Sequence, residues 1–360
     1  MNARRDFGWR MLLPSLLVTL AALLPAAFAS IGEAPSTIMS ALASYQPAPA
    51  NGGFTAGSGF HFQIASAKDI AIAVSGEGTL NDANVRFVSD LIGAATGYGQ
   101  GIAGPAAQFF RSQAASLAGK GPSAVGVEEY VLHLTVTGEA PYHLSFTLQP
   151  QTVDPSKFPP ATHSFGPADA KHVIRVFSDF ECPYCARFAD TVMPKLKAQL
   201  ISKGDIRFEY HDFPLTSIHP NAMAASEAAE CVIAANDPAA FWTYHDALFA
   251  NQASWVQLSD PVDALVSLAA KAGLKVDGVA ACIRNGTYKS KIEAGLRAAA
   301  TDLHISGTPT VFVDDLKVGN YTDVASYVRL LTLSDALRAS GAGSTGAAGA
   351  TTPPGGGTTQ

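Results

Sequence analysis

The sequence predicts an α/β protein with two domains, a small α+β domain followed by a domain in which strands and helices alternate. The chain has 360 residues, enough for two domains of ordinary size. Four segments before residue 149 alternate apolar and polar residues, as half-buried strands do. After residue 170 the predicted order is strand, helix, strand, helical block, two strands and a helix.

The composition is that of a globular protein with a lightly charged surface. Hydrophobic residues make up 48% of the chain and charged residues 15%, and the net charge is −6. No basic excess is present, so nucleic acid is not an expected partner. No motif for a cofactor or a metal was identified, and none is predicted.

The first 29 residues have the pattern of an export signal. Arg4, Arg5 and Arg10 precede an uncharged run from Met11 to Ala29, which ends in small residues. This order is typical of a secretory signal peptide. The run is also long enough for an uncleaved membrane anchor, which remains the alternative. Either form predicts an extracytoplasmic location, in the periplasm or cell envelope.

Residues 30–57 are expected to form a linker, because residues 45–59 carry turn-forming residues and no apolar period. Residues 58–149 are expected to form the α+β domain. Its strands are predicted around residues 60–64, 70–74, 130–136 and 142–148, the last two as a hairpin. One helix should start near Asn81 or Asp82 and a second should follow Pro105. The role of this domain is not evident from its residues.

Residues 150–170 contain five prolines and are expected to be a second linker. Residues 339–360 form a low-complexity tail with nothing to bury, so it should be disordered. Between them, residues 171–338 form the second domain. Strands are predicted over 171–178, 205–213 and 311–313, with 317–318 as a hairpin partner, and the last helix over about 323–337. A helix from Cys182 to about residue 202 should be kinked by Pro194.

The Cys182-Pro183-Tyr184-Cys185 motif at the start of this helix indicates redox chemistry. Cysteines at i and i+3 lie on one face of a first turn, where their sulfurs can bond. Pro183 suits the first turn because its missing N–H costs nothing there. The helix N-terminus should lower the pKa of Cys182 and make it the nucleophile. Cys185, one turn inside, should be the more shielded, resolving cysteine.

Two other interpretations of this motif are possible. A zinc site needs a second close pair of ligands, but the remaining cysteines, Cys231 and Cys282, are single and far apart. An inert structural disulfide is the second alternative. The context of the motif favours a reactive pair over both.

Residues 165–338 resemble the DsbA-like branch of the thioredoxin fold. The matching segments are residues 177–185 (FSDFECPYC), 210–215 (YHDFPL) and 307–310 (GTPT), together with Pro194. The resemblance implies a thioredoxin fold with a helical insertion over about residues 216–303. It also implies that Pro309 is a cis proline facing the cysteine pair, which lets Thr308 meet a bound peptide.

The chain departs from the family pattern at two places. Tyr184 stands where DsbA-like oxidases often carry histidine, and Val176 stands where many thioredoxin-fold proteins keep a buried acid. Asp179 and Glu181 are closer to the cysteines, and the expectation is that both are solvated. His211 and His219 are expected to be surface or hydrogen-bonded residues, and Trp242 a core residue.

Some relatives carry a second disulfide within the helical insertion, at places similar to Cys231 and Cys282. The resemblance therefore implies a structural disulfide between these residues, with two buried free thiols as the alternative. Such a bond closes a loop of about 50 residues, which gives roughly 4 kcal/mol at most.

Three functions follow. The first is a dithiol oxidase that takes electrons from cysteines of exported proteins and is reoxidised by a quinone-linked membrane partner, as the resemblance implies. The second is an isomerase or reductase, dimerised through the amino-terminal domain. The third is a binding or chaperone module with a redox-inert pair. Substrates, electron partner and oligomeric state are not evident from the sequence.

Overall fold

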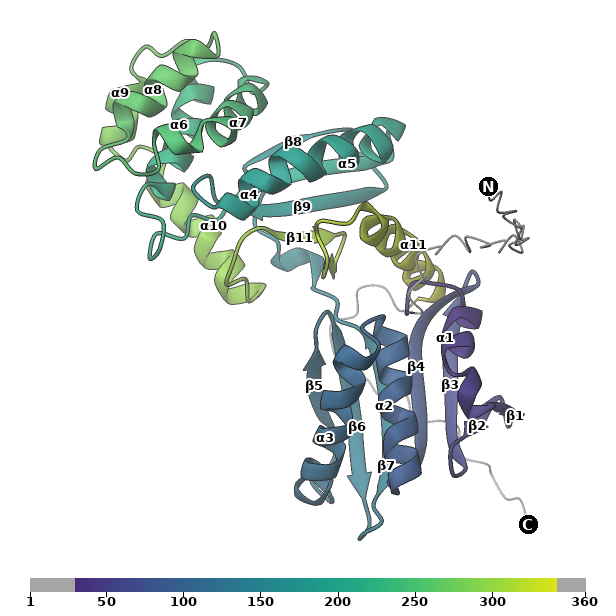
Figure 1. Ribbon diagram of the computed structural model, residues 1–360. Coiled ribbons are helices and arrows are strands. Elements are labelled where there is room, and N and C mark those ends of the chain that lie inside the picture. Colours follow the sequence, from purple (N-terminus) through teal and green to yellow (C-terminus); the bar gives the residue numbers. More distant parts are fainter. Residues whose placement is uncertain (1–29, 342–360) are drawn as a thin grey trace, which may run out of the picture.

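The computed structural model describes residues 30–341, which form two domains joined by packed contacts (Figure 1). The expected signal segment, residues 1–29, and tail residues 342–360 lie outside this range. The last helix, α11 (Val324–Ser340), continues through the expected start of the tail. Within residues 30–341, no helix has both the length and the apolar character needed to cross a membrane.

The amino-terminal domain is built on a seven-stranded antiparallel sheet in the order β1-β2-β3-β4-β7-β6-β5. Helices α1, α2 and α3 lie against this sheet (Figure 1). The strands are β1 (Ala48–Ala50), β2 (Gly53–Ala56), β3 (Phe60–Ala67), β4 (Ile70–Thr79), β5 (Ser123–Val127), β6 (Tyr130–Thr137) and β7 (His143–Pro150); the helices are α1 (Pro35–Ala41), η1 (Ala43–Tyr45), α2 (Asp82–Thr96) and α3 (Gln100–Leu117).

The period-two pattern located the four longest strands of this sheet. On β6, every second side chain from Tyr130 to Val136 is buried, and β6 pairs with β7 in the predicted hairpin. Asn81 caps α2 by accepting a hydrogen bond from the N–H of Asn84, as its side chain predicts. The second helix begins at Gln100 rather than after Pro105, which lies inside it.

The expected linker over residues 30–57 is instead part of the folded domain. It contains α1, η1 and the hairpin of β1 with β2. Ile31, Ile38 and Leu42 are almost completely buried and join the core. Their spacing fits a helix face, but only three apolar side chains carry it, and they come from a turn, a short helix and its end.

The carboxy-terminal domain has a five-stranded sheet in the order β12-β11-β9-β10-β8. Only β9 and β10 run parallel; the other pairs are antiparallel. The strands are β8 (His163–Phe165), β9 (His172–Ser178), β10 (Ile206–Asp212), β11 (Thr310–Val313) and β12 (Leu316–Lys317). The expected linker over residues 150–170 therefore contributes β8, whose Phe165 stacks on Phe208 with ring centroids 5.1 Å apart.

The long helix after β9 is divided as Pro194 predicts. It consists of α4 (Pro183–Arg187), a π-helical segment η3 (Phe188–Val192) and α5 (Met193–Gln199), followed by η4 (Ile201–Lys203). A proline removes one backbone donor, and the wider π turn before Pro194 accommodates this loss.

The helical block between β10 and β11 stands apart at one end of the sheet (Figure 1). Its elements are α6 (Ala222–Ala235), α7 (Ala240–Ala250), η5 (Gln252–Ser254), α8 (Val262–Lys271), α9 (Val279–Arg284) and α10 (Lys289–Asp302). Trp242, predicted to be a core residue, is partly buried in it, and Phe241, Tyr244 and Leu248 are buried beside it.

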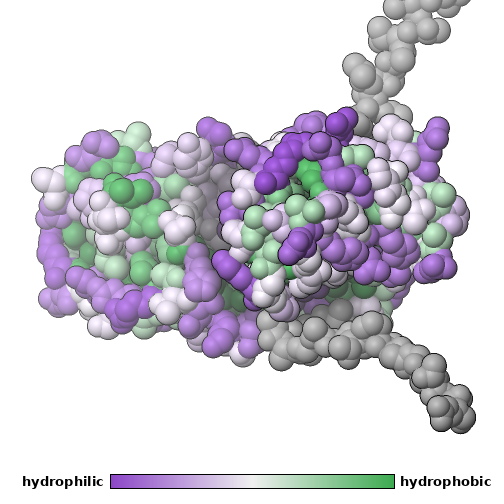
Figure 2. Space-filling model, turned by 90° about the horizontal axis from the view of Figure 1, so that it is seen from below, coloured by the Kyte–Doolittle hydropathy of each residue, from purple (hydrophilic) through white to green (hydrophobic). Residues whose placement is uncertain are grey.

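Helix α11 connects the two domains. It belongs to the carboxy-terminal domain and packs on strands β3 and β4 of the amino-terminal domain. Arg329 of α11 donates hydrogen bonds to Ser30 and Tyr130 and lies 3.9 Å from Glu129. Seen from below, the surface is hollowed between two lobes, and hydrophobic residues are scattered among hydrophilic ones (Figure 2).

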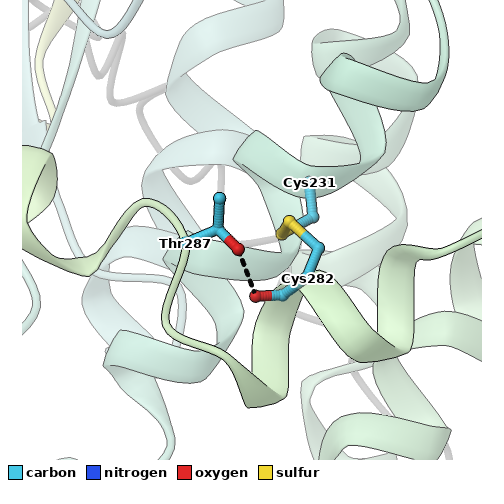
Figure 3. The surroundings of a disulfide bond; sticks show 3 residues. All are labelled: Cys231, Cys282 and Thr287. Atoms are coloured by element: carbon cyan, nitrogen blue, oxygen red, sulfur yellow. Dashed lines mark hydrogen bonds between the residues drawn. A yellow bond between two sulfur atoms is a disulfide. The ribbon is translucent and has the colours of Figure 1, made fainter.

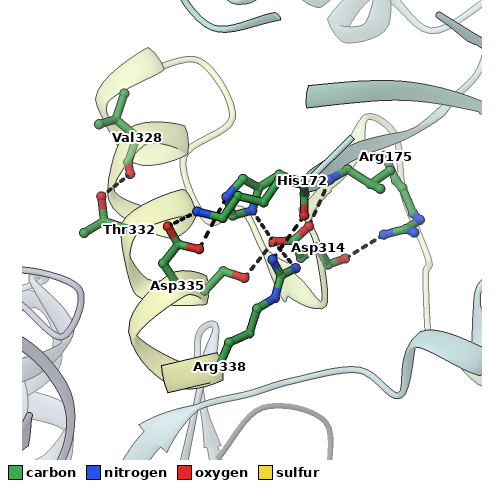
Figure 4. Close-up of polar contacts among 10 residues, drawn as sticks. His172, Arg175, Asp314, Val328, Thr332, Asp335 and Arg338 are labelled. Carbon is green, nitrogen blue, oxygen red and sulfur yellow. Dashed lines mark hydrogen bonds and ion pairs between the residues drawn. The ribbon is translucent and has the colours of Figure 1, made fainter. Parts of the chain in front are cut away.

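A polar cluster fixes α11 to the start of β9 and the end of β11 (Figure 4). Asp314 is its centre: its carboxylate lies 2.8 Å from His172, 2.6 Å from Ser334 and 2.9 Å from Arg338. These contacts lie at the end of β9 opposite the cysteine motif, so they hold the scaffold rather than the reactive residues.

Candidate active site

The reactive motif occupies the turn between β9 and α4. Cys182 is the N-cap of α4, Pro183 is its first residue and Cys185 lies one turn inside. Both cysteines are free thiols, and only 4% of Cys182 and 1% of Cys185 is exposed. The sequence predicted the helix start and the greater shielding of Cys185, while Cys182 is more buried than an open nucleophile would be.

The surroundings of Cys182 stabilise its thiolate. The Cys185 thiol hydrogen-bonds to it and is the main cause that lowers the pKa of Cys182 to about 6. Burial opposes this effect, whereas the Thr308 hydroxyl and the backbone N–H groups of Tyr184 and Cys185 add to it. The helix start therefore contributes as expected, but the neighbouring thiol contributes more.

Cys185 has the opposite character. Burial raises its pKa well above the usual value, and the adjacent Cys182 raises it further. The N–H of Asp179 donates to its sulfur over 3.5 Å. At neutral pH one sulfur is therefore ionised and the other holds its proton, which is the division of roles that thiol–disulfide exchange requires.

The loop before β11 faces this pair. The Thr308–Pro309 peptide bond is cis, as the family resemblance implied. The Cys182 sulfur lies 3.4 Å from the carbonyl oxygen of Thr308. Because β11 pairs with β9 from Thr310 onwards, the sheet itself holds this loop beside the thiols.

The family-model match falls on this second domain. Residues 159–332 match the family model described as Thioredoxin. Disulfide bond formation protein D of Bacillus subtilis is 26% identical over 159 residues, which are 44% of this chain and 70% of that protein. The second domain is therefore similar to thioredoxin-family proteins and to this disulfide bond formation protein.

Two further matches involve proteins of different overall length. The Na(+)/H(+) antiporter NhaA 3 of Salinispora tropica is 34% identical over 163 residues, 45% of this chain. The chain spans only 22% of the length of that antiporter. The crystal structure of oxidised BdbD from Bacillus subtilis aligns with 25% identity and a TM-score of 0.44, over 51% of this chain and 96% of that one.

The two acids beside the motif are buried, so the expectation that they are solvated is wrong. Asp179 has no exposed surface, and its carboxylate accepts from the N–H groups of Glu181 and Leu215. The ring of His219 lies 2.7 Å from the same carboxylate. The expectation failed because two of these partners, Leu215 and His219, come from a loop more than 30 residues away.

Glu181 connects the motif to the helical insertion. It is 9% exposed and accepts a hydrogen bond of 2.7 Å from the N–H of Asn221, next to the start of α6. Burial raises the pKa of Glu181. The Asn221 side chain in turn donates to three carbonyl groups, those of Trp255, Val256 and Leu258.

Gln252 is a positioning residue that the sequence did not indicate. Its side-chain amide donates to the carbonyl of Phe180 over 2.7 Å and to that of Cys182 over 3.1 Å. It therefore holds both ends of the turn that leads into the nucleophile. No local signal could reveal this, because Gln252 lies about 70 residues further along the chain.

The remaining residues named from the sequence take different places. Tyr184 is 55% exposed. His219 is hydrogen-bonded, as expected. The expectation is wrong for His211, which is buried and has no hydrogen-bond partner at either ring nitrogen. Its ring instead stacks on Phe177 with centroids 4.5 Å apart, and burial lowers its pKa.

The helical insertion of the DsbA-like domain carries a disulfide between Cys231 and Cys282 (Figure 3). Their Cα atoms are 6.0 Å apart, and the bond joins α6 to α9. The hydroxyl of Thr287 donates to the carbonyl of Cys282 over 3.0 Å. The structure thus contains this bond rather than the two free thiols that were the alternative.

Proposed function

We propose that this chain is an extracytoplasmic dithiol oxidase that transfers its Cys182–Cys185 disulfide to pairs of cysteines in exported proteins. The observation that supports this most strongly is the unequal ionisation of the two cysteines. The pKa of Cys182 is lowered to about 6 while that of Cys185 is raised. A stable Cys182 thiolate favours the reduced form over the disulfide and makes Cys182 a good leaving group from the mixed disulfide, so a substrate readily reduces the pair.

The reaction consists of two exchanges. A substrate thiolate attacks the Cys182 sulfur, the Cys182–Cys185 bond breaks, and Cys185 leaves with the electron pair and takes up a proton. A second substrate thiolate then attacks the substrate sulfur of the mixed disulfide, and Cys182 leaves as a thiolate. The substrate loses two electrons and gains a disulfide, and the enzyme becomes the dithiol.

Each residue of the site has a role in this scheme. Cys182 is the sulfur attacked and Cys185 the resolving sulfur. The Thr308–Pro309 loop would pair with the extended substrate backbone beside Cys182. The exposed ring of Tyr184 would meet substrate side chains, and Pro183 would keep the first turn free of a competing N–H.

An oxidising compartment agrees with the disulfide between Cys231 and Cys282. There, a membrane partner linked to quinones would reoxidise the dithiol. The same exchange run in reverse, starting from the thiolate of Cys182, would make the chain a reductase or an isomerase. Direction therefore depends on the reduction potential of the pair.

The test combines activity with redox-dependent stability. We expect the oxidised chain to form one disulfide per molecule in a reduced two-cysteine peptide, and Cys182→Ser to form none. We also expect the reduced chain to melt at a higher temperature than the oxidised chain, because the thiolate stabilises the reduced form. A reduced form of lower melting temperature, together with reduction of insulin by the dithiol, would instead indicate a reductase.

A further inference from the structure

The reverse step of the proposed exchange requires Cys185 to lose a proton in a closed environment. When the dithiol attacks a disulfide, Cys182 forms a mixed disulfide, and Cys185 must then attack it as a thiolate. Cys185 is 1% exposed, and a docked substrate would cover the side of Cys182. The proton therefore needs an acceptor inside the protein.

A row of buried polar groups begins at Cys185. The Ser178 hydroxyl faces both the Cys185 thiol and the phenol of Tyr210. Tyr210 is 1% exposed, and its hydroxyl has no partner within hydrogen-bond distance. On the parallel strands β9 and β10, Ser178 pairs with Asp212 and Val176 with Tyr210, so these side chains share one face of the sheet.

Asp212 lies next in this row. It is 6% exposed, and neither of its carboxyl oxygens has a hydrogen-bond partner. Burial raises the pKa of Asp212 to about 7, and the facing hydroxyls of Ser226 and Thr162 oppose this rise. A carboxyl group in this state exchanges its proton near neutral pH.

The row continues to the surface through α6. Ser226 and Glu230 lie one turn apart on that helix. Glu230 pairs with Lys291 at 3.0 Å and with His163 at 3.6 Å, and the Lys291 side chain is 59% exposed. The titratable and charged groups around Asp212 and Tyr210 are Cys185 and Asp179 after β9, His163 of β8, Glu230 of α6, His245 of α7 and Lys291 of α10.

The other acids beside the thiols are already engaged. Both oxygens of Asp179 accept hydrogen bonds, from Glu181 and from Leu215 and His219. Glu181 accepts from Asn221. Within residues 30–341, Asp212 is the one carboxyl group with both oxygens buried and unpartnered. Burying a carboxyl group without hydrogen-bond partners costs stability. A purely structural role of Asp212 would not require this cost.

We propose that Asp212 accepts the proton of Cys185 through Ser178 and Tyr210 and passes it to solvent on the side of Glu230 and Lys291. As the Cys185 sulfur bonds to Cys182, the substrate sulfur leaves with the electron pair. The unpartnered Tyr210 hydroxyl and Asp212 carboxylate then turn into hydrogen-bond contact, and the proton of Cys185 moves along the hydroxyl groups to the carboxylate. In the oxidase direction the same row returns a proton to Cys185. Asp212 is thus a positioning residue that acts through the hydroxyls, and its role rests on the proposed function.

The test mixes the reduced chain with excess of a chromogenic aromatic disulfide in stopped flow. The first phase, proportional to reagent concentration, reports attack by Cys182, and the second, independent of it, reports attack by Cys185. We expect Asp212→Asn to leave the first phase unchanged and to slow the second about tenfold near neutral pH. The difference in second-phase rate between Asp212→Asn and the unmodified chain should become smaller at higher pH, where hydroxide removes the proton of Cys185 directly.

Glu227→Gln is the matched control, since Glu227 is also a buried acid of this domain with an unpartnered oxygen. It should leave both phases unchanged. A second phase in Asp212→Asn equal to that of the unmodified chain would overturn the inference, while loss of a Cys182-dependent first phase in the unmodified chain would overturn the proposed function. If Asp212→Asn does not fold, Tyr210→Phe must slow the second phase; an unchanged second phase overturns the inference.

Discussion

The ring nitrogen Nδ1 of His219 lies 2.7 Å from the Oδ2 atom of Asp179, across 40 residues of sequence. The same oxygen accepts from the N–H of Leu215, and the other oxygen accepts from Glu181. Asp179 follows β9 directly, three residues before the nucleophile. It therefore ties the turn that carries Cys182 to the loop that enters the helical insertion.

Replacing Asp179 by Asn keeps the shape and removes the charge that holds this loop. We expect the free energy of unfolding to fall by about 2–3 kcal/mol, because a buried, charge-assisted set of hydrogen bonds is weakened. Urea denaturation of the oxidised chain measures this. Asp263→Asn is the control: Asp263 pairs with Arg284 at the surface, and its loss should cost under about 1 kcal/mol. Equal losses would show that Asp179 does not fix the loop.

Gln252 should matter for the geometry of the same turn. Gln252→Ala removes the donor shared by the carbonyls of Phe180 and Cys182, so we expect about 1–2 kcal/mol less stability. We also expect slower transfer of the disulfide to a peptide, because the turn before Cys182 loosens. The exposed Gln257 offers the comparison, and Gln257→Ala should change neither quantity.

The disulfide of the insertion should stabilise without taking part in exchange. It links residues 51 apart, and Cys231→Ser with Cys282→Ser should lower the free energy of unfolding by about 2–4 kcal/mol. Peptide oxidation by the folded double variant should match that of the unmodified chain. Loss of oxidation in a variant that is still folded would mean that this pair also exchanges with substrates.

Stability of the reduced chain should depend on pH through Cys182. Its pKa is about 6 in the folded chain and about 8.5 when unfolded. Between these values the unfolded state binds more protons, so stability relative to Cys182→Ser should rise with pH. Below about pH 6 the thiolate should no longer make the unmodified chain more stable than Cys182→Ser. Chemical denaturation of both reduced chains, kept below about pH 8 so that Cys185 stays protonated, tests this. A flat or falling difference would contradict it.

The sequence predicted the elements whose pattern is local. The alternation of apolar and polar residues predicted β3, β4, β6 and β7. The spacing of Cys182 and Cys185, together with Pro183, predicted the start of α4. The short strand β8 was missed because only three residues pair and the prolines around it suggested a linker. Residues 30–57 were missed because three isolated apolar side chains carry the packing there.

The polar part of the site could be predicted less well. Asp179 and Glu181 were expected to be solvated because their partners, His219 and Asn221, lie about 40 residues away and meet them only in the folded chain. The position of Gln252 depends on how the insertion packs back on the motif. The family resemblance supplied what the residues alone did not, the cis peptide before Pro309 and the pairing of Cys231 with Cys282.

The ionisation of Cys182 tests the account most directly. Thiolate absorbance of the reduced chain in the ultraviolet, followed against pH, should show one cysteine titrating near pH 6, as its surroundings require. This step should vanish in Cys182→Ser and persist in Cys231→Ser with Cys282→Ser. If no thiolate forms below about pH 8, the nucleophile is an ordinary thiol and the proposed exchange loses its physical basis.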